Sequence, residues 1–322
     1  MIAFIIRRLL GALLVMFTLS VLVFLIFFAT PSVDPASQIA GRNASPQTLE
    51  QVRHDFGLDR PLPVQYVIMM KKLFWSRDLA SFTNRGAKIL PQIEAATPVT
   101  LSLVIGAAII WVFFAIVMGV LAAVMRGTFV DPLIMIIGLI GISMPVFWLG
   151  EVVNLVTQSR LHSELFFWLP PLGYIPFTTS PSGWFKCLLF PWITLSVLYI
   201  GFYSRVLRSS ILENQELDFV RTARSKGLTE QRVLVKHVLR TSMITFVSLF
   251  GLDFGALVAG GALLTEVVFG LPGVGKLTYD SLQNLDLPMI LATVIYASFF
   301  IILANTIIDI LYGILDPRVR VG

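Results

Sequence analysis

The sequence predicts an all-α polytopic membrane protein with six transmembrane helices and with both termini in the cytoplasm. Hydrophobic residues make up 56% of the chain and charged residues 13%, and the mean hydropathy is +0.84. These values exclude a soluble globular protein. Six apolar runs are long enough to cross a bilayer, and Lys and Arg concentrate in the segments on one side of them.

Each predicted span contains about 20 predominantly apolar residues, the length that crosses the hydrocarbon core. The six runs cover residues 9–30, 99–124, 132–157, 188–206, 241–265 and 289–312. The first run follows Arg7 and Arg8, as in a secretory signal, but it is longer than the roughly 7 to 15 apolar residues of such signals. No convincing cleavage site follows it, so we expect an uncleaved signal anchor.

The distribution of positive charge predicts the orientation. With the first segment inside, thirteen Lys and Arg residues lie in inside segments and three lie in the two short outside loops. The first outside loop holds the other eight, but loops longer than about 60 residues report poorly on orientation. The same topology accounts for the pI of 9.5, so we predict contact with the lipid bilayer and no nucleic-acid partner.

The spans divide the chain into three parts. Residues 1–30 form the first transmembrane helix, residues 31–98 an extracytoplasmic loop subdomain, and residues 99–322 a core membrane domain. In the loop subdomain we expect a helix over residues 47–56, opened by Ser45 and Pro46 in N-cap and N1 positions. The core domain contains spans two to six and a cytoplasmic loop at residues 207–240.

The cytoplasmic loop is predicted to be a helix, a tight corner and a second helix. Residues 209–226 contain no Pro or Gly, and Lys226 followed by Gly227 suits a helix C-terminus. Thr229 then occupies an N-cap position, with Glu230 in the first turn of the next helix. The loop offers a partner protein both apolar anchors and positive charge: Leu212, Leu217, Phe219 and Val220, with Arg221, Arg224, Lys226, Arg232 and Lys236.

Two acidic residues and one proline lie inside the predicted spans. Glu151 lies in the third span and Asp253 in the fifth, and intramembrane acids are costly and by default face a cavity or a partner. They line a substrate pathway or form interhelical hydrogen bonds, and the sequence leaves both alternatives open. Pro145 lies within the third span, where it predicts a kinked helix; such kinks often border a cavity, although many are only structural.

The fifth span also carries a stripe of small residues. Gly251, Gly255 and Ala259 recur at four-residue spacing. Small residues one turn apart let helix backbones approach closely. We therefore expect this face to pack against another helix, in this chain or in a partner subunit.

The chain offers no recognisable catalytic or metal site. Cys187 is the single cysteine, which excludes an internal disulfide and a cysteine-rich metal site. The three histidines lie in separate loops on both sides of the membrane, so we expect no metal cluster: His54, His162 and His237.

Residues 270–276 imitate the start of a phosphate-binding loop. The spacing Gly-x4-Gly-Lys is present, but Leu277 stands where the magnesium-binding Ser or Thr belongs. The predicted topology also places this segment outside, away from ATP. We expect no cofactor in this chain.

Positive charge alone does not identify a docking surface, because the positive-inside rule places Lys and Arg in any such loop. The order of the residues is more specific. The segment from Phe219 to Leu228 resembles the cytoplasmic signature of ABC-importer permeases, in the oligopeptide and dipeptide branch, which reads Val-Arg-Thr-Ala-Arg-x-Lys-Gly-Leu. The broader importer pattern is retained at Ala223, Gly227 and Leu239 but not at Arg221, His237 and Arg240, departures that suit the peptide branch.

Three further segments carry the same resemblance over nearly the whole chain. They are residues 56–66 of the first loop, residues 143–150 of the third span and residues 265–275 after the fifth span. The resemblance implies a type I ABC importer permease fold in a bacterial inner membrane. It also implies a transport subunit without an ATPase site that moves dipeptides or oligopeptides, with nickel complexes or glutathione as alternatives.

The resemblance further implies the partners. They are a second homologous permease subunit, two ABC ATPase subunits or domains that bind ATP and Mg, and an extracytoplasmic binding protein that delivers the peptide and that the first loop could contact. The rival interpretation is an ion-coupled secondary transporter, which would normally show inverted repeats and paired broken helices. A third is a membrane-anchored scaffold without transport activity.

The resemblance assigns roles to two groups of residues, beside the speculative pathway residues Glu151, Asp253 and Pro145. The expected ATPase-coupling residues are Phe219, Arg221, Thr222, Ala223, Arg224, Lys226, Gly227 and Leu239. The expected gate loop contains Pro272, Gly273 and Gly275, and it returns partly into the bundle.

Overall fold

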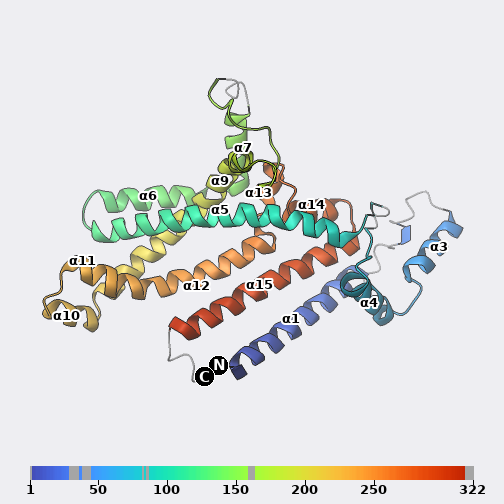
Figure 1. Cartoon of the computed structure of the whole chain (residues 1–322), viewed down its shortest axis with the longest axis horizontal. Coiled ribbons are helices and arrows are strands. Elements are labelled where there is room, and N and C mark those ends of the chain that lie inside the picture. Colours follow the sequence, from blue (N-terminus) through green and yellow to red (C-terminus); the bar gives the residue numbers. More distant parts are fainter. Residues whose placement is uncertain are drawn as a thin grey trace.

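The computed structural model describes residues 2–28, 36–37, 45–81, 83–84, 87–158 and 164–315. Apart from one isolated antiparallel bridge between Ala80 and Lys88, the regular elements of these residues are helices. The long helices lie side by side along the long axis of the molecule (Figure 1). This architecture confirms the predicted all-α class.

Several helices are long and apolar enough to cross a membrane. Among the described residues four qualify outright: α5 (Ile89–Val124), α9 (Pro181–Gln215), the segment Glu230–Gly261, and Leu287–Ile307 within α15 (Leu287–Leu315). The segment Glu230–Gly261 consists of α11 (Glu230–Val233), η2 (Leu234–Leu239), α12 (Arg240–Ala256) and η3 (Leu257–Gly261). The first helix, α1 (Ile2–Phe28), contains a shorter apolar stretch at Leu10–Ile26.

The predicted third span is not one kinked helix. Helix α6 (Val130–Ser143) and helix α7 (Val146–Thr157) meet at 93°, and α7 rises away from the bundle (Figure 1). Pro145 is extended, with φ −61° and ψ 131°. Its ring disfavours the helical conformation for Met144, and it lacks a donor N–H, so α6 ends here. The chain thus bends at Pro145, as predicted, but through a break between two helices rather than a kink within one.

Helices α5 and α9 form the centre of the bundle. The side chains of Trp111 and Tyr203 are fully buried and stack near each other, with ring centroids 6.2 Å apart. Helix α6 packs on α9 where two glycines meet, since a Cβ on Gly201 would lie 2.2 Å from the carbonyl oxygen of Gly138. Close backbone contact of this kind fixes the positions of the helices.

The small-residue stripe of the fifth span packs within the chain. A Cβ on Gly255 of α12 would lie 2.4 Å from the Cβ of Ala304 on α15. The prediction that this face packs against another helix is confirmed for Gly255. Helix α15 supplies the contact, so no partner subunit is needed to explain this glycine.

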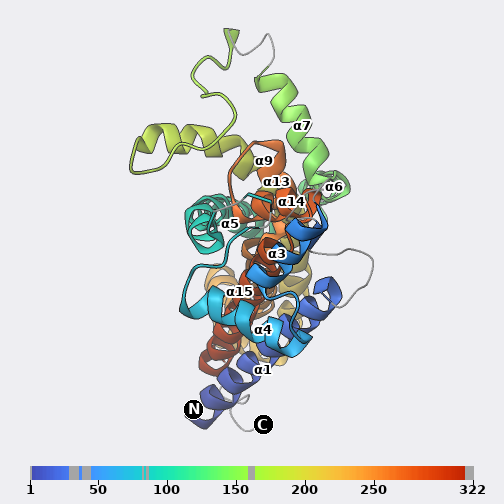
Figure 2. The ribbon, with the colours of Figure 1, turned by 90° about the vertical axis from the view of Figure 1, so that its right-hand side faces the viewer.

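The short helices gather at the two ends of the bundle. Helix α10 (Asp218–Ser225) and α11 lie at one end, on the side where α1 begins and α15 ends (Figure 1). At the other end lie α3 (Pro46–Phe56), α4 (Leu62–Met70), η1 (Lys71–Trp75), α13 (Leu263–Val268) and α14 (Val274–Gln283). Viewed from this second end, α3 and α4 lie across the bundle (Figure 2).

The loop subdomain is attached through its own apolar cluster. Helix α3 begins at Pro46, as predicted, and residues 31–35, 38–44, 82 and 85–86 of the loop lie outside the described residues. The cluster joins α1 and α4 to the start of α5 and to α15 through Phe24, Met69, Leu73, Leu79, Ile89, Ile93, Met289, Leu291, Ala292 and Ile295.

Candidate functional site

The predicted helical corner exists, but its first helix is interrupted. Helix α9 ends at Gln215, Leu217 is extended with φ −72° and ψ 150°, and α10 begins at Asp218. The expectation of one helix over residues 209–226 is therefore wrong. The break turns α10 so that Val220 and Ala223 enter the main apolar core, and this burial overrides a local sequence that favours helix.

Gly227 has the conformation that the sequence predicts. Its φ is +78°, and the N–H groups of Gly227 and Leu228 donate to the carbonyls of Arg224 at 2.9 Å and Ala223 at 3.4 Å. This pair of bonds is the Schellman ending of a helix. No heavy atom lies within 4 Å of the position that a Cβ would occupy, so the chain itself leaves the space beside Gly227 open.

Thr229 occupies the N-cap position of α11, as predicted, but its side chain makes no capping hydrogen bond. The first turn of α11 instead carries an ion pair. The Nε of Arg224 donates to Oε1 of Glu230 at 2.8 Å, and its second nitrogen donates to Oε2 at 3.1 Å. This bidentate pair joins α10 to α11 at the surface of the corner.

The corner presents a mixed apolar and cationic surface. Phe219, Arg221, Thr222, Lys226 and Gly227 are exposed. Two further apolar side chains on this surface were not among the predicted coupling residues: Leu217, 45% exposed, and Val235, 57% exposed. Isolated exposure is ordinary, but a group of large apolar side chains beside positive charge is typical of a protein-binding surface.

Two of the predicted coupling residues lie beneath this surface. Ala223 is buried, and Leu239 is half-buried against the main core. They are placed to support the corner rather than to touch a partner. The prediction had grouped them with the exposed residues because position in a motif carries no information on burial.

A buried ion pair that the sequence did not indicate lies beneath the same end. Arg208 of α9 donates to Asp131 of α6, with Nε to Oδ1 and a terminal nitrogen to Oδ2 both at 2.6 Å. The two side chains are only 24% and 10% exposed. In the sequence, Arg208 is only one of many cations predicted to lie in the cytoplasm, and 77 residues separate the partners.

Asp253 makes the interhelical hydrogen bond that the sequence left as one alternative. The hydroxyl of Tyr203 on α9 donates to Oδ2 of Asp253 on α12 at 2.6 Å. Glu151 is exposed and belongs to α7, the helix that rises away from the bundle (Figure 1). An apolar hollow of about 300 Å³ opens between α5, α12 and α15, and neither acid lines it.

The predicted gate loop lies against the second end of the bundle. Leu271, Gly273, Val274 and Gly275 are buried, whereas Pro272 is exposed. A Cβ on Gly273 would lie 2.3 Å from Cδ of Glu266, and a Cβ on Gly275 would lie 2.6 Å from the Cα of Leu263. Both positions therefore require glycine for close approach.

Glu266 is the centre of this loop, and the sequence analysis did not single it out. The side chain is fully buried. Its Oε1 accepts from the hydroxyl of Thr100 on α5 at 2.6 Å, and its Oε2 accepts from the N–H of Lys276 at 2.9 Å. Burial raises the pKa of Glu266 to about 7, while these hydrogen bonds act in the opposite direction.

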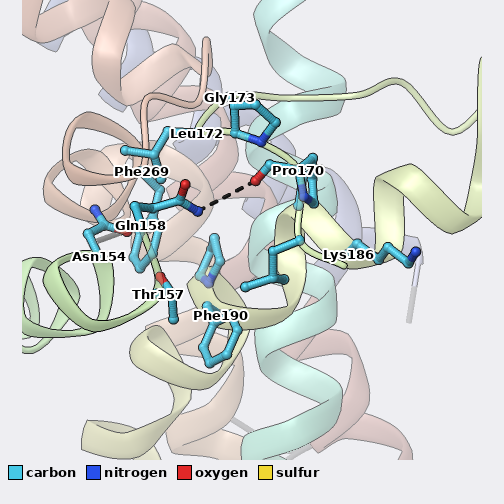
Figure 3. A pocket seen from close by; sticks show the side chains of 13 residues that line it. Asn154, Thr157, Gln158, Pro170, Leu172, Gly173, Lys186, Phe190 and Phe269 are labelled. Atoms are coloured by element: carbon cyan, nitrogen blue, oxygen red, sulfur yellow. Dashed lines mark hydrogen bonds between the residues drawn. The ribbon is translucent and has the colours of Figure 1, made fainter. Parts of the chain in front are cut away.

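A small pocket lies where α7 meets α9 and the loop at residues 169–173 (Figure 3). It encloses about 20 Å³, room for a water molecule but not for a peptide. The Nδ2 of Asn154 donates to the carbonyl of Val268 at 2.9 Å, and Gln158 reaches the carbonyl of Pro170 at 3.5 Å. These bonds join α7 to α13 and Gln158 to the loop, and the pocket is too small for a transported solute.

No group of three His, Cys, Asp or Glu side chains suited to a metal ion occurs among the described residues. His162 lies outside that part of the chain.

Comparisons with known proteins cover almost the whole chain. Residues 115–321 match the family model of the binding-protein-dependent transport system inner membrane component. Residues 1–104 match the model of the N-terminal region of the same kind of membrane component.

Individual relatives align over nearly their full length. A putative peptide transport system permease protein of Brucella abortus (strain 2308) is 38% identical over 320 residues, 99% of each chain. The glutathione transport system permease protein GsiC of Escherichia coli (strain K12) is 36% identical, again over 99% of each chain. The probable D,D-dipeptide transport system permease protein DdpB of the same strain is 33% identical, over 98% of this chain and 97% of that one.

A solved structure supports the fold. The inward-facing MetNI methionine ABC transporter contains a chain that superposes with a TM-score of 0.51 at 16% sequence identity. The superposition covers 70% of this chain and 97% of that chain.

Proposed function

The chain belongs to the family of binding-protein-dependent transport system inner membrane components, and from this premise we propose that it is one permease subunit of an ATP-driven peptide importer. It is an inner-membrane transport component and not the catalytic subunit of its system. The observation that carries the proposal is the exposed corner around Gly227, because a transport chain without an ATP site needs a surface on which an ATPase acts.

The coupling role is supported by the shape of the corner. Phe219, Leu217 and Val235 offer apolar anchors, and Arg221 and Lys226 offer charge, on a corner where Arg224 and Glu230 join α10 to α11. A movement of the docked ATPase would be transmitted through α10 and α11 into α9 and α12, which are continuous with them along the chain. Such rigid-body movement would open the path alternately to each side.

The proposed topology has six spans and cytoplasmic termini. It adds α1 and the bent pair α6 and α7 to the four helices that qualify by length and hydropathy. The beginning of α1 and the end of α15 lie on the side of the coupling corner (Figure 1), which is the arrangement that six spans require. Residues 31–98 then lie outside, where we propose that they contact the binding protein.

The peptide substrate is supported by relatives from several bacteria. The Brucella and D,D-dipeptide permeases carry peptide transport in their names, and the glutathione permease supports glutathione, itself a tripeptide, as a second candidate. The remaining subunits of the complex follow from this proposal: a homologous permease partner and two ATPase subunits that bind ATP and Mg. An ion-coupled transporter would need none of them.

The function is tested by purifying the chain with its native partners and reconstituting the complex in liposomes. We expect an ATPase to copurify, and we expect uptake of a dipeptide or oligopeptide only when ATP is on the ATPase side. Glutathione is the parallel substrate. Uptake that follows an ion gradient without ATP would overturn the proposal, and uptake of glutathione alone would replace the substrate.

The transport pathway requires its own test. We propose that Asp253 faces the path and binds the amine of a passing peptide, with Pro145 and Glu151 at its outer rim. An Asp253→Asn change keeps an acceptor for Tyr203 but removes the charge, so we expect uptake to fall about 10-fold for loss of one charge-assisted contact. Glu151→Gln is the corresponding change at the proposed outer rim, where the side chain is exposed. Normal uptake by the Asp253 variant, at normal expression, would exclude Asp253 from the pathway.

A further inference from the structure

One buried carboxylate connects three helices at the second end of the bundle. Glu266 belongs to α13, accepts a hydrogen bond from Thr100 of α5, and accepts another from the N–H of Lys276 in the first turn of α14. Thr100 is itself fully buried, and its hydroxyl oxygen accepts from the N–H of Val274 at 2.8 Å. The start of α14 is thus tied to α5 through a continuous chain of hydrogen bonds.

The similarity of residues 270–276 to a phosphate-binding loop has a physical basis. Glycines let a backbone approach an anion, and N–H groups at the start of a helix favour negative charge. Here the anion is the carboxyl group of the chain itself, which receives the N–H of Lys276 and a further backbone hydrogen bond from Gly275. Gly273 leaves room for it, since a Cβ there would overlap the carboxyl carbon.

A joint precedes this assembly. Gly260 in η3 has φ +123° and ψ 0°, so the helix of the fifth span is interrupted between α12 and α13. The position of a Cβ on Gly260 has no heavy atom within 4 Å. Residues with a Cβ rarely adopt this φ, so glycine at position 260 permits the bend between α12 and α13, and rotation there would move α13 and the start of α14 relative to α12.

The other end of α14 is held separately. Asp286, between α14 and α15, accepts a hydrogen bond from the hydroxyl of Ser81 in the loop subdomain, and both side chains are buried. Loss of the contacts that Thr100 makes with Glu266 and with the N–H of Val274 would therefore free the start of α14 while its end stays attached. Helix α14 would then move about its attached end.

We propose that Glu266 is the latch of the extracytoplasmic gate, holding the start of α14 on α5 until rotation at Gly260 opens this side of the path. Glu266 acts as a positioning residue and touches no substrate. The inference rests on the proposed transport function and deepens it, because it names the contact that must break for the gate to open.

The test measures the distance between α5 and α14. Spin labels are placed on the exposed positions 95 and 279 through Ala95→Cys and Tyr279→Cys, in a chain that carries Cys187→Ser. The complex is purified with its native partners, without nucleotide or substrate. We expect one narrow distance distribution for the otherwise unchanged chain, corresponding to the latched state.

Two variants should release the latch. Glu266→Ala removes the acceptor, and Thr100→Val removes the hydroxyl at nearly the same volume. Loss of one buried charge-assisted hydrogen bond should shift the ratio of latched to released states about 10-fold or more, seen as a second, longer distance. Glu266→Gln keeps one acceptor oxygen but places an NH2 group where the second oxygen accepts a hydrogen bond, so its shift should be smaller than that of Glu266→Ala. Asp280→Asn, a change of an exposed acid on the same helix, should leave the distribution unaltered.

A parent-like distribution for both releasing variants would overturn the latch. If Glu266→Ala prevents folding, Thr100→Val alone decides, because it leaves the carboxyl group and its backbone partners in place. The measurement uses no peptide, so it separates the two proposals. If the variants shift the distance but the complex does not import peptides, the latch is kept and the peptide substrate is rejected. If the complex imports peptides but the variants leave the distance unchanged, the substrate is kept and the latch is rejected.

Discussion

The two ends of the bundle each carry a glycine-containing corner between short helices. The charged side chains are exposed at one corner and buried at the other. At the corner of α10 and α11, the space beside Gly227 is empty and the ion pair of Arg224 and Glu230 is 41% and 73% exposed. At the corner of α13 and α14, the space beside Gly273 is filled by the fully buried carboxyl group of Glu266.

The difference indicates what each corner does. A corner that leaves its charges and large apolar side chains exposed has contacts to make with another molecule. A corner that satisfies a buried carboxyl group with a hydroxyl and backbone N–H groups has made its contacts within the chain. The first is suited to receive force from a partner, and the second is suited to hold or release one of the chain's own helices.

The largest expected effect is loss of transport from a change at Gly227. Gly227→Val places a β-branched residue at φ +78°, where L-residues are strained by roughly 1 to 2 kcal/mol or more. The two hydrogen bonds that end α10 should be lost, and the exposed surface of the corner should change shape. We expect uptake to fall by about 100-fold while membrane insertion stays normal. Uptake and the amount of copurified ATPase are measured together.

The matched control is Gly127→Val, between α5 and α6. Gly127 has φ +84° and also has no heavy atom within 4 Å of a Cβ position. The strain is therefore comparable, but Gly127 is not part of the α10 and α11 corner. If both variants lose ATPase and uptake equally, the docking assignment of Gly227 is rejected in favour of general strain.

The second corner should respond through stability. Gly273→Ala puts a methyl group 2.3 Å from Cδ of Glu266, and overpacking of a filled site typically costs about 1 to 3 kcal/mol. We expect a lower thermal unfolding temperature of the purified chain and reduced uptake. In a Glu266→Ala background the methyl group has room, so Gly273→Ala should lower the unfolding temperature little further. An equal decrease in both backgrounds would argue against the contact between position 273 and Glu266.

The smallest effect is a pH dependence confined to the second corner. Burial raises the pKa of Glu266 from 4.5 to about 7, so the folded chain binds this proton more tightly than the unfolded chain. The resulting stabilisation is complete below the unfolded pKa and is lost as the pH rises through about 7. Between pH 6 and pH 8 the loss is about 1 kcal/mol.

The measurement is thermal unfolding of the parent and of Glu266→Gln across this range. The Gln variant should lack the loss of thermal stability that titration of Glu266 causes as the pH rises. Lys276→Gln and Tyr296→Phe change the titratable groups on α14 and α15 near the carboxyl group, and these variants should retain that loss. Parallel slopes for the parent and the Gln variant would exclude Glu266 as the titrating group.

Much of the first corner could be predicted from the sequence, because its signals are local. Lys226 and Gly227 mark a helix end through the dipole and through a left-handed φ, and the structure has both. The break at Leu217 could not be predicted, since no Pro or Gly marks it and its cause is the burial of Val220 and Ala223 in the core. Pro145 was recognised as a disruption, but whether it kinks or ends a helix depends on what surrounds α7.

The sequence by itself determined the membrane class, the positions of most long helices and the basic end of the bundle, because hydropathy, helix ends and charge asymmetry act over short stretches of chain. Only the tertiary structure decided which charges are buried and with what. Asp131 meets Arg208 across 77 residues, and Thr100 meets Glu266 across 166. A buried charge takes its role from its partners, and partners this far apart are brought together only by helix packing.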